Sequence, residues 1–150
     1  MAVRIRPQRV EDLPQLILIW RGAVEASHGF LTPDDVDWYE ELVSGHLPRM
    51  SDLRVAVRDD GRPVGFIAAE AGEIHMLFVA PQAHGTGVGT ALLEHVGATE
   101  STLRLDVNEQ NPAAVAFYLA RGFEQVGRSE LDGQGRPFPL LHLVRRQPMS

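Results

Sequence analysis

A glycine-rich segment between a predicted strand and a predicted helix constrains the fold more than any other feature of the sequence. The segment "PQAHGTGVGTALLEH" (81–95) has glycine at every second position from Gly85 to Gly89. Glycine lowers the stability of a regular element, so this cluster indicates a tight turn or the close approach of a ligand to the backbone. The apolar segment "EIHMLFVA" (73–80) precedes it, and a leucine-bearing helical pattern follows. The sequence thus predicts a strand, a glycine turn and a helix in succession.

The rest of the chain alternates between strand and helix signals. Thr32 is a predicted N-cap with Pro33 at the first helical position, and Pro112 opens a later helix in the same way. The expected elements, in order, are a strand at 3–6, helices at 11–26 and from Thr32 to about Gly45, a hairpin at 53–70, a strand at 73–80, a helix to about Ala98, a strand at 102–108, a helix at 111–123 and two strands around 130–137.

This order, β α α β β β α β α β β, indicates a mixed α/β sheet. A strand–helix–strand connection in the middle implies one parallel pair, whereas the hairpins on either side are antiparallel. The 150 residues, of which 44% are hydrophobic, fit one domain with a real core. We therefore expect residues 1–150 to form a single domain.

Composition and charge exclude several classes of function. The net charge of −6 disfavours nucleic-acid binding as the main task, because phosphate neutralisation needs a basic face. The absence of cysteine excludes disulfides, thiolate metal sites and a cysteine nucleophile, and the scattered histidines suggest no metal site. No segment approaches the roughly 20 apolar residues that cross a bilayer, and the first residues lack a signal-peptide pattern. We expect a cytoplasmic protein with no membrane contact.

The glycine turn is a predicted phosphate site, because it presents backbone N–H groups at the positive end of a helix dipole. A P-loop would need GxxxxGK[ST], and this turn contains no lysine. A dinucleotide turn would need GxGxxG and an acid about 20 residues later. Asp106 matches that distance, but the third glycine comes one position early and too few elements follow. A nucleotide-binding oxidoreductase is thus disfavoured, and the pyrophosphate of coenzyme A is the remaining candidate.

Two motifs carry a resemblance to a known family. "QAHGTG" (82–87) resembles the Q/R-x-x-G-x-G/A motif of the GNAT superfamily of acetyl-CoA-dependent N-acetyltransferases. "NPAAVAFYLARGF" (111–123) resembles its second signature, N-x-x-A-x-x-F-Y followed by G-F. The element order agrees over nearly the whole chain, and "SHGFL" and "DVNEQN" resemble a subgroup of small bacterial members, some acting on protein lysines. The resemblance implies an α+β fold with a mixed, mostly antiparallel sheet flanked by helices, its central parallel strand pair splayed around the cofactor.

The resemblance also implies direct transfer of an acetyl group from acetyl-CoA to an amine, with Tyr118 as the acid that protonates the departing thiolate. The alternative for Tyr118 is a core aromatic on an amphipathic helix. Asn111 matches an asparagine that approaches the cofactor, and its alternative is a helix N-cap. The implied cofactor-binding residues are Leu77, Phe78, Val79, Gln82, Gly85, Thr86, Gly87, Val88, Gly89, Thr90 and Asn111.

A free amine is mostly protonated at neutral pH, so the reaction needs a base, and histidine suits this task. The candidates for binding the acceptor or taking its proton are His28 and Phe30, in the break between the first two helices, and Glu73 and His75, which we expect on one face of the central strand. His142 in the last strand is a further candidate. For each histidine, the alternative is a structural or surface role.

The acceptor is expected to be an amine of a small molecule or of a protein, and a homodimer is allowed for. Acidic residues on the second helix would attract cationic amines, although a solvated helix face explains them equally; they are Asp34, Asp35, Asp37, Glu40 and Glu41. The alternative function is a non-catalytic acyl-CoA sensor of the same fold. An intact phosphate turn together with Tyr118 favours the enzyme.

Overall fold

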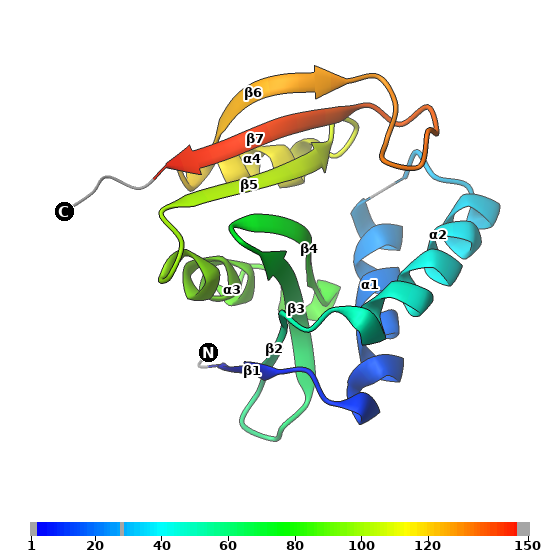
Figure 1. Ribbon diagram of the computed structural model, residues 1–150. Helices are drawn as coiled ribbons and strands as arrows, with labels where there is room; N and C mark the ends of the chain where they lie inside the picture. The colour runs from blue at the N-terminus through cyan, green and yellow to red at the C-terminus, as the bar shows by residue number, and fades with distance from the viewer. Residues whose placement is uncertain (1–2, 28, 147–150) are drawn as a thin grey trace.

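The computed structural model describes residues 3–27 and 29–146, which form a seven-stranded sheet with α-helices on both faces (Figure 1). The strands are β1 Arg4–Pro7, β2 Leu53–Val57, β3 Pro63–Glu70, β4 Glu73–Val79, β5 Thr102–Asn108, β6 Glu124–Ser129 and β7 Leu140–Arg146. The α-helices are α1 Leu13–Ser27, α2 Pro33–His46, α3 Val88–Gly97 and α4 Pro112–Ala120, and short 3₁₀ turns occupy Val10–Asp12, Leu47–Arg49 and Pro81–Ala83. The predicted order of elements is confirmed.

The sheet order is β1-β2-β3-β4-β5-β7-β6. Its neighbouring strands run antiparallel, except for the parallel pair β4–β5. That pair has only two registered positions, Glu73 opposite Arg104 and Ile74 opposite Leu105, after which the strands part. The predicted mixed sheet with a splayed central parallel pair is confirmed.

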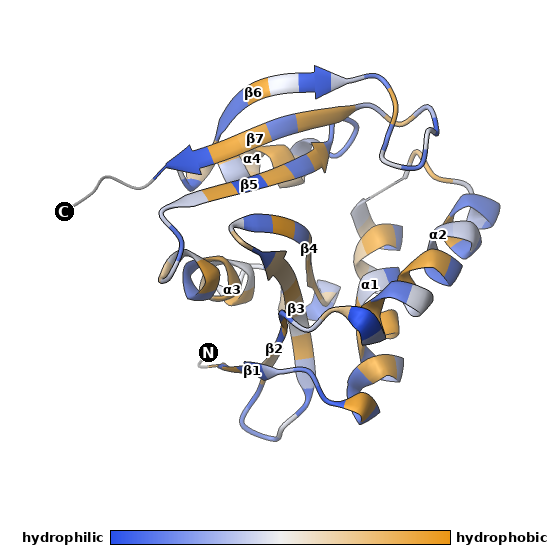
Figure 2. Ribbon diagram, in the orientation of Figure 1, coloured by the Kyte–Doolittle hydropathy of each residue, from blue (hydrophilic) through white to orange (hydrophobic). Residues whose placement is uncertain are grey.

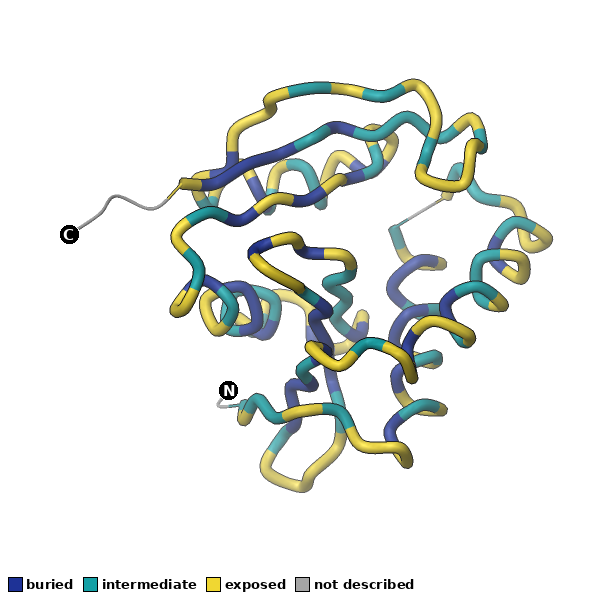
Figure 3. The backbone as a smooth tube through the Cα atoms, viewed as in Figure 1, coloured by how far each residue is buried: buried dark blue, intermediate teal, exposed yellow. Residues whose placement is uncertain are grey.

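Each face of the sheet carries its own hydrophobic core. Helices α1 and α2 pack on β2–β4 through residues such as Leu16, Trp20 and Phe66. Helix α3 and the aromatic Tyr118 of α4 pack with residues of β5 and β7 on the other face. Figure 3 shows the buried segments along these contacts, and Figure 2 shows hydrophilic and hydrophobic residues alternating along β5 and β7. Such alternation fits strands with one face on the core and one in solvent.

The helix boundaries follow from local sequence signals. The Thr32 hydroxyl accepts a hydrogen bond from the Asp35 amide at 3.1 Å, and the Asp35 carboxylate accepts one from the Thr32 amide at 3.0 Å, which completes a capping box. The side chain of Asn111 caps α4 by accepting from the Ala114 amide at 3.3 Å. Gly122, with φ of +92°, follows the end of α4.

A β-bulge in β4 corrects one expectation. Met76 pairs with Ala68, and Ile74 pairs with Ala69. His75 therefore has no paired residue on β3. Ile74 packs in the core beneath α3, whereas Met76 packs against the core beneath α1. Alternation therefore breaks between them, and the spacing of Glu73 and His75 does not place these residues on one face.

Two features are absent from residues 3–27 and 29–146. No helix in this part of the chain is long and apolar enough to cross a membrane. The same residues contain no group of three or more acidic, histidine or cysteine side chains arranged to hold a metal ion.

Candidate active site

A cavity of about 590 Å³ lies beside the parted strands. Its walls come from β4, the glycine turn, the faces of α3 and α4, and the C-terminal end of α1. Ten residues predicted from the sequence line it: Leu77, Phe78, Val79, Gly85, Gly87, Val88, Gly89, Thr90, Asn111 and Tyr118. The fold thus gathers most of the predicted cofactor residues and the predicted acid around one space.

The glycines of the turn serve two different purposes. Gly85 and Gly87 have φ of +77° and +87°, a region that favours glycine, and a Cβ on either would meet nothing within 4 Å. Gly89 lies inside α3, where a Cβ would come within 3.2 Å of the Phe117 ring. The first two glycines therefore shape an open turn at the N-terminus of α3, and the third lets α3 and α4 approach closely.

Strand β4 offers an open backbone edge to the cavity. Leu77, Phe78 and Val79 pair with β3 on one side. On the other side, the registered pairing with β5 ends at Ile74. Backbone groups on this open edge can hydrogen-bond an extended ligand in the manner of an added strand.

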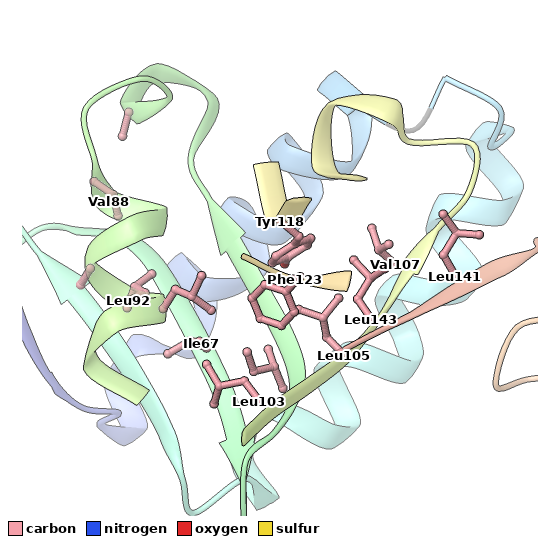
Figure 4. Packing of buried hydrophobic residues seen from close by; sticks show 14 of the residues in the cluster. Ile67, Val88, Leu92, Leu103, Leu105, Val107, Tyr118, Phe123, Leu141 and Leu143 are labelled. Carbon is pink, nitrogen blue, oxygen red and sulfur yellow. The ribbon is translucent and has the colours of Figure 1, made fainter. Parts of the chain in front are cut away.

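Tyr118 is a core aromatic that also lines the cavity, and its role as the acid stays a prediction. It is buried, with 8% of its surface exposed, and this burial raises the pKa of the phenol well above its ordinary value. The ring meets Phe123 edge-on at a centroid distance of 5.4 Å, and Figure 4 shows the two rings side by side within the core. The same residue lines the cavity. A phenol in this setting stays protonated at neutral pH, as a general acid must, while the raised pKa makes it a weaker proton donor than a free phenol.

Asn111 likewise combines its two predicted settings. It caps α4 and is 7% exposed, and it also lines the cavity. The capping role is confirmed by the hydrogen bond to Ala114, and the contact with a cofactor stays a prediction.

Sequence reasoning expected His84, inside the glycine turn, to contact cofactor or solvent, and His84 lines the cavity. It missed seven residues of the cavity wall, namely Ala23, Ser27, Ala83, Ala113, Ala114, Phe117 and Arg121. Arg121 is the most informative of them. Its Nε donates to the Thr90 hydroxyl at 2.9 Å, its Nη1 donates to the Phe117 carbonyl at 2.9 Å, and its guanidinium lies 3.7 Å from the centroid of the Phe117 ring. Positions 113, 114, 117, 118 and 121 follow the spacing of one helix face, so the helical period extended from Tyr118 could have found them.

Besides His142, five predicted residues do not line this cavity, and one more lies outside the described residues. Gln82 is exposed, and the Thr86 hydroxyl donates to the Ala83 carbonyl. Phe30 packs near Phe138, with ring centroids 5.7 Å apart. Glu73 and His75 are exposed on β4. His28 is the predicted residue that the structure does not describe.

His142 belongs to a separate cluster across the second half of the sheet. Its Nδ1 lies 2.5 Å from an Asp106 carboxylate oxygen on β5, and its Nε2 lies 2.7 Å from the Ser129 hydroxyl on β6. The three side chains join neighbouring strands and are not part of the cavity wall.

A sheet whose central parallel strands part beside a glycine turn is the architecture of coenzyme A-dependent acetyltransferases. The PaiA N-acetyltransferase of Thermoplasma acidophilum, solved in complex with coenzyme A, is similar with a TM-score of 0.76 over 97% of this chain and 99% of its own. At 20% identity, this likeness concerns the fold alone.

The sequence places the chain within this class. The profile of the acetyltransferase (GNAT) domain matches residues 34–138. The chain belongs to the GNAT family and is an acetyltransferase. It is 44% identical to the peptidyl-lysine N-acetyltransferase YjaB of Salmonella typhimurium over 96% of this chain and 99% of that protein. The solution structure of apo-form YjaB from Escherichia coli is similar with a TM-score of 0.92 at 40% identity, over 99% of this chain and 100% of its own.

Proposed function

We propose that this acetyltransferase moves an acetyl group from acetyl-CoA to the side-chain amine of a lysine in a protein. The observation that carries the proposal is the cavity beside the parted strands, bordered by the glycine turn on one side and Tyr118 on the other. The relative that is 44% identical over 96% of this chain is a peptidyl-lysine N-acetyltransferase, which supports lysine as the acceptor.

The glycine turn and β4 are proposed to hold the donor. The turn from Gln82 to Thr90 would bind the pyrophosphate through backbone N–H groups at the start of α3, where the helix dipole favours an anion. The open edge at Leu77, Phe78 and Val79 would pair with the pantetheine arm. The donor fits because the positive-φ glycines add no side chain to the cavity and the pairing of β4 with β5 ends early.

Tyr118 is proposed as the general acid. The lysine nitrogen attacks the thioester carbonyl carbon, the carbon–sulfur bond breaks, and the thiolate takes the phenolic proton of Tyr118. The proton of the amine would pass through water to Glu73 or His75, both exposed on β4. A backbone N–H of β4 would stabilise the developing oxyanion, an interaction that typically contributes about 3 kcal/mol. We propose that residues 1–150 act as one catalytic domain and that the protein is cytoplasmic.

The experiment compares two peptides that differ at one residue. Each peptide has a blocked N-terminus, and one carries a lysine where the other carries norleucine, which has a similar length and no amine. With acetyl-CoA and this protein, we expect thiol release and acetylation of the lysine peptide alone. Equal thiol release with the two peptides would overturn the proposal in favour of another acceptor. Binding of coenzyme A without thiol release from any lysine peptide would overturn it in favour of a non-catalytic sensor.

A further inference from the structure

A cluster of aromatic and acidic side chains surrounds one arginine at the opposite end of the molecule from β1. The β6–β7 connection reaches the start of α2, as Figure 1 shows, and places the Arg136 guanidinium among three rings. The guanidinium carbon lies 4.6 Å from the Trp38 centroid, 5.2 Å from that of Tyr39 and 5.5 Å from that of Phe138. Arg136 Nη2 also donates to the Asp35 carboxylate at 2.5 Å.

A second carboxylate is fixed beside the same rings. Asp132 accepts a hydrogen bond from the Tyr39 hydroxyl and another from the backbone amide of Arg136, the latter at 2.9 Å. Burial and the neighbouring Asp132 raise the pKa of Tyr39, so this phenol stays a hydrogen-bond donor. Aromatic faces combined with carboxylates attract organic cations. We call Asp35, Trp38, Tyr39, Asp132 and Phe138 the cation cage.

The chain that follows α1 links the candidate active site to the cation cage. Ser27, at the C-terminal end of α1, lines the cavity of the proposed donor site. Phe30 follows soon after in the chain, and its ring lies 5.7 Å from that of Phe138 in the cage. We infer that an acceptor peptide reaching the cavity at the C-terminal end of α1 extends toward Phe30 and the cage.

The Arg136 guanidinium does not use all of its hydrogen-bond donors in the cage. Its Nη1 is buried and has no hydrogen-bond partner within residues 3–27 and 29–146, a condition that costs free energy. Its side chain is still 29% exposed, and Trp38 is 42% exposed, so one wall of the cage faces solvent. Displacement of the Arg136 guanidinium would free Asp35 Oδ1 and the ring faces for an external cation, while Asp132 stays hydrogen-bonded to Tyr39 and to two loop amides and adds its negative charge.

We propose that the cation cage is an acceptor subsite for a guanidinium or ammonium side chain close to the acetylated lysine, and that Arg136 fills it when no acceptor is bound. The assignment rests on the proposed function for its acceptor role. It predicts that the protein favours lysines with a basic neighbour. It also predicts that removing the Arg136 guanidinium opens the subsite to an external cation.

The first test measures binding in the Arg136→Met variant, because Met retains an unbranched apolar chain and lacks the charge. The probes are Nα-acetyl-arginine amide and its neutral isostere Nα-acetyl-citrulline amide, and Trp38 fluorescence reports binding because the other tryptophan, Trp20, is buried. A tethered competitor acts at an effective concentration on the order of millimolar. We expect the variant to bind the arginine probe about tenfold more tightly than the natural protein does. Equal binding of the arginine and citrulline probes by the variant would overturn the subsite.

A second variant tests whether the arginine probe binds in the cage. Asp35→Asn, combined with Arg136→Met, removes a carboxylate but retains an oxygen that can accept from the Thr32 amide, so the cap of α2 should survive. We expect this change to weaken arginine binding about tenfold, as loss of a charge-assisted hydrogen bond does. Unchanged binding would place the probe elsewhere and overturn the assignment. Arg136→Gln replaces Arg136→Met in both proteins if the Met variant melts much lower.

Kinetics then separate this inference from the proposed function. The acceptors are two lysine peptides with arginine or citrulline beside the lysine. We expect kcat/KM to be about tenfold higher for the arginine peptide, and the preference to grow in Arg136→Met. Acetylation of both peptides at equal efficiency would overturn the subsite and leave the proposed function standing. Arginine-selective binding without acetylation of either peptide would overturn the proposed function and remove the acceptor role from the cage.

Discussion

At the scale of single residues, the candidate site depends on side chains with two settings each. Tyr118 packs in the core and lines the cavity, and Asn111 caps α4 and lines the same cavity. Sequence reasoning left both pairs of roles open, because periodicity reports that a helix face is buried and not what it is buried against. The match to the second signature favoured the functional role of each residue. The structure puts both residues on the cavity wall as well as in their structural settings, and the functional roles stay predictions.

For Tyr118, the Phe variant separates the phenol from the ring. Tyr118→Phe should lower kcat by about 10²–10⁴-fold, since the proton is needed only as the thiolate departs. The affinity for coenzyme A and the melting temperature should barely change, because the ring contacts with Phe117 and Phe123 survive. Steady-state kinetics beside a coenzyme A titration measure both quantities. A fall of less than about threefold, with chemistry limiting the rate, would mean that Tyr118 is not the acid.

A larger side chain in place of Gly87 should disturb coenzyme A binding more than it disturbs folding. Gly87→Val places a β-branched residue at φ of +87°, which costs about 1–2 kcal/mol, yet its Cβ meets no other atom within 4 Å. The variant should fold and lose the rise in melting temperature that coenzyme A produces. Gly61→Val is the matched control, with φ of +82° and equally open space in the β2–β3 turn. If the control loses the coenzyme A response as well, strain rather than the turn explains the result.

At the scale of elements, features that depend on local sequence were predicted better than features that depend on how strands pair. Thr32 and Pro112 set the starts of α2 and α4 because a cap depends on neighbours within a few residues. The bulge at His75 escaped prediction, since it depends on how β4 registers against β3. The resemblance, and not the pattern, predicted that β4 and β5 part, because an apolar strand looks the same with or without a second neighbour. The point at which they part was not predicted.

A buried ion pair links β1 to the turn before α1. Asp12 accepts from Arg6 at 2.8 and 2.9 Å and from the Arg9 amide at 2.7 Å. The hydrogen bonds from Arg6 lower the pKa of Asp12 in the folded protein, so this pair stabilises the fold above the ordinary pKa of aspartate, and the contribution is lost as pH falls through the lowered value.

Asp12→Asn should therefore lower the free energy of unfolding by about 2 kcal/mol at pH 7. Urea unfolding of both proteins between pH 7 and pH 3 measures the difference. It should stay constant above about pH 5 and narrow at lower pH. A difference that persists unchanged to the lowest pH would mean that the charge of Asp12 does not stabilise the fold.

At the scale of the whole molecule, the two cores and the parted sheet together position the cavity. One core fixes α1 and α2 on β2–β4, the other fixes α3 and α4, and the cavity lies where the two halves of the sheet separate. The sequence predicted the order of elements and most of the cavity wall. It missed the contribution of α1 at Ala23 and Ser27, because no local signal tells which helix end will face a distant strand.

The central claim is that the parted strands, the glycine turn and Tyr118 together hold the acetyl donor. The most direct measurement is a crystal structure of this protein with coenzyme A bound. We expect the pyrophosphate on the amides of the Gly85–Thr90 turn, the pantetheine arm paired with Leu77–Val79, and the sulfur within about 3.2 Å of the Tyr118 hydroxyl or one water away. Coenzyme A bound outside this cavity, or a sulfur remote from Tyr118, would contradict the account.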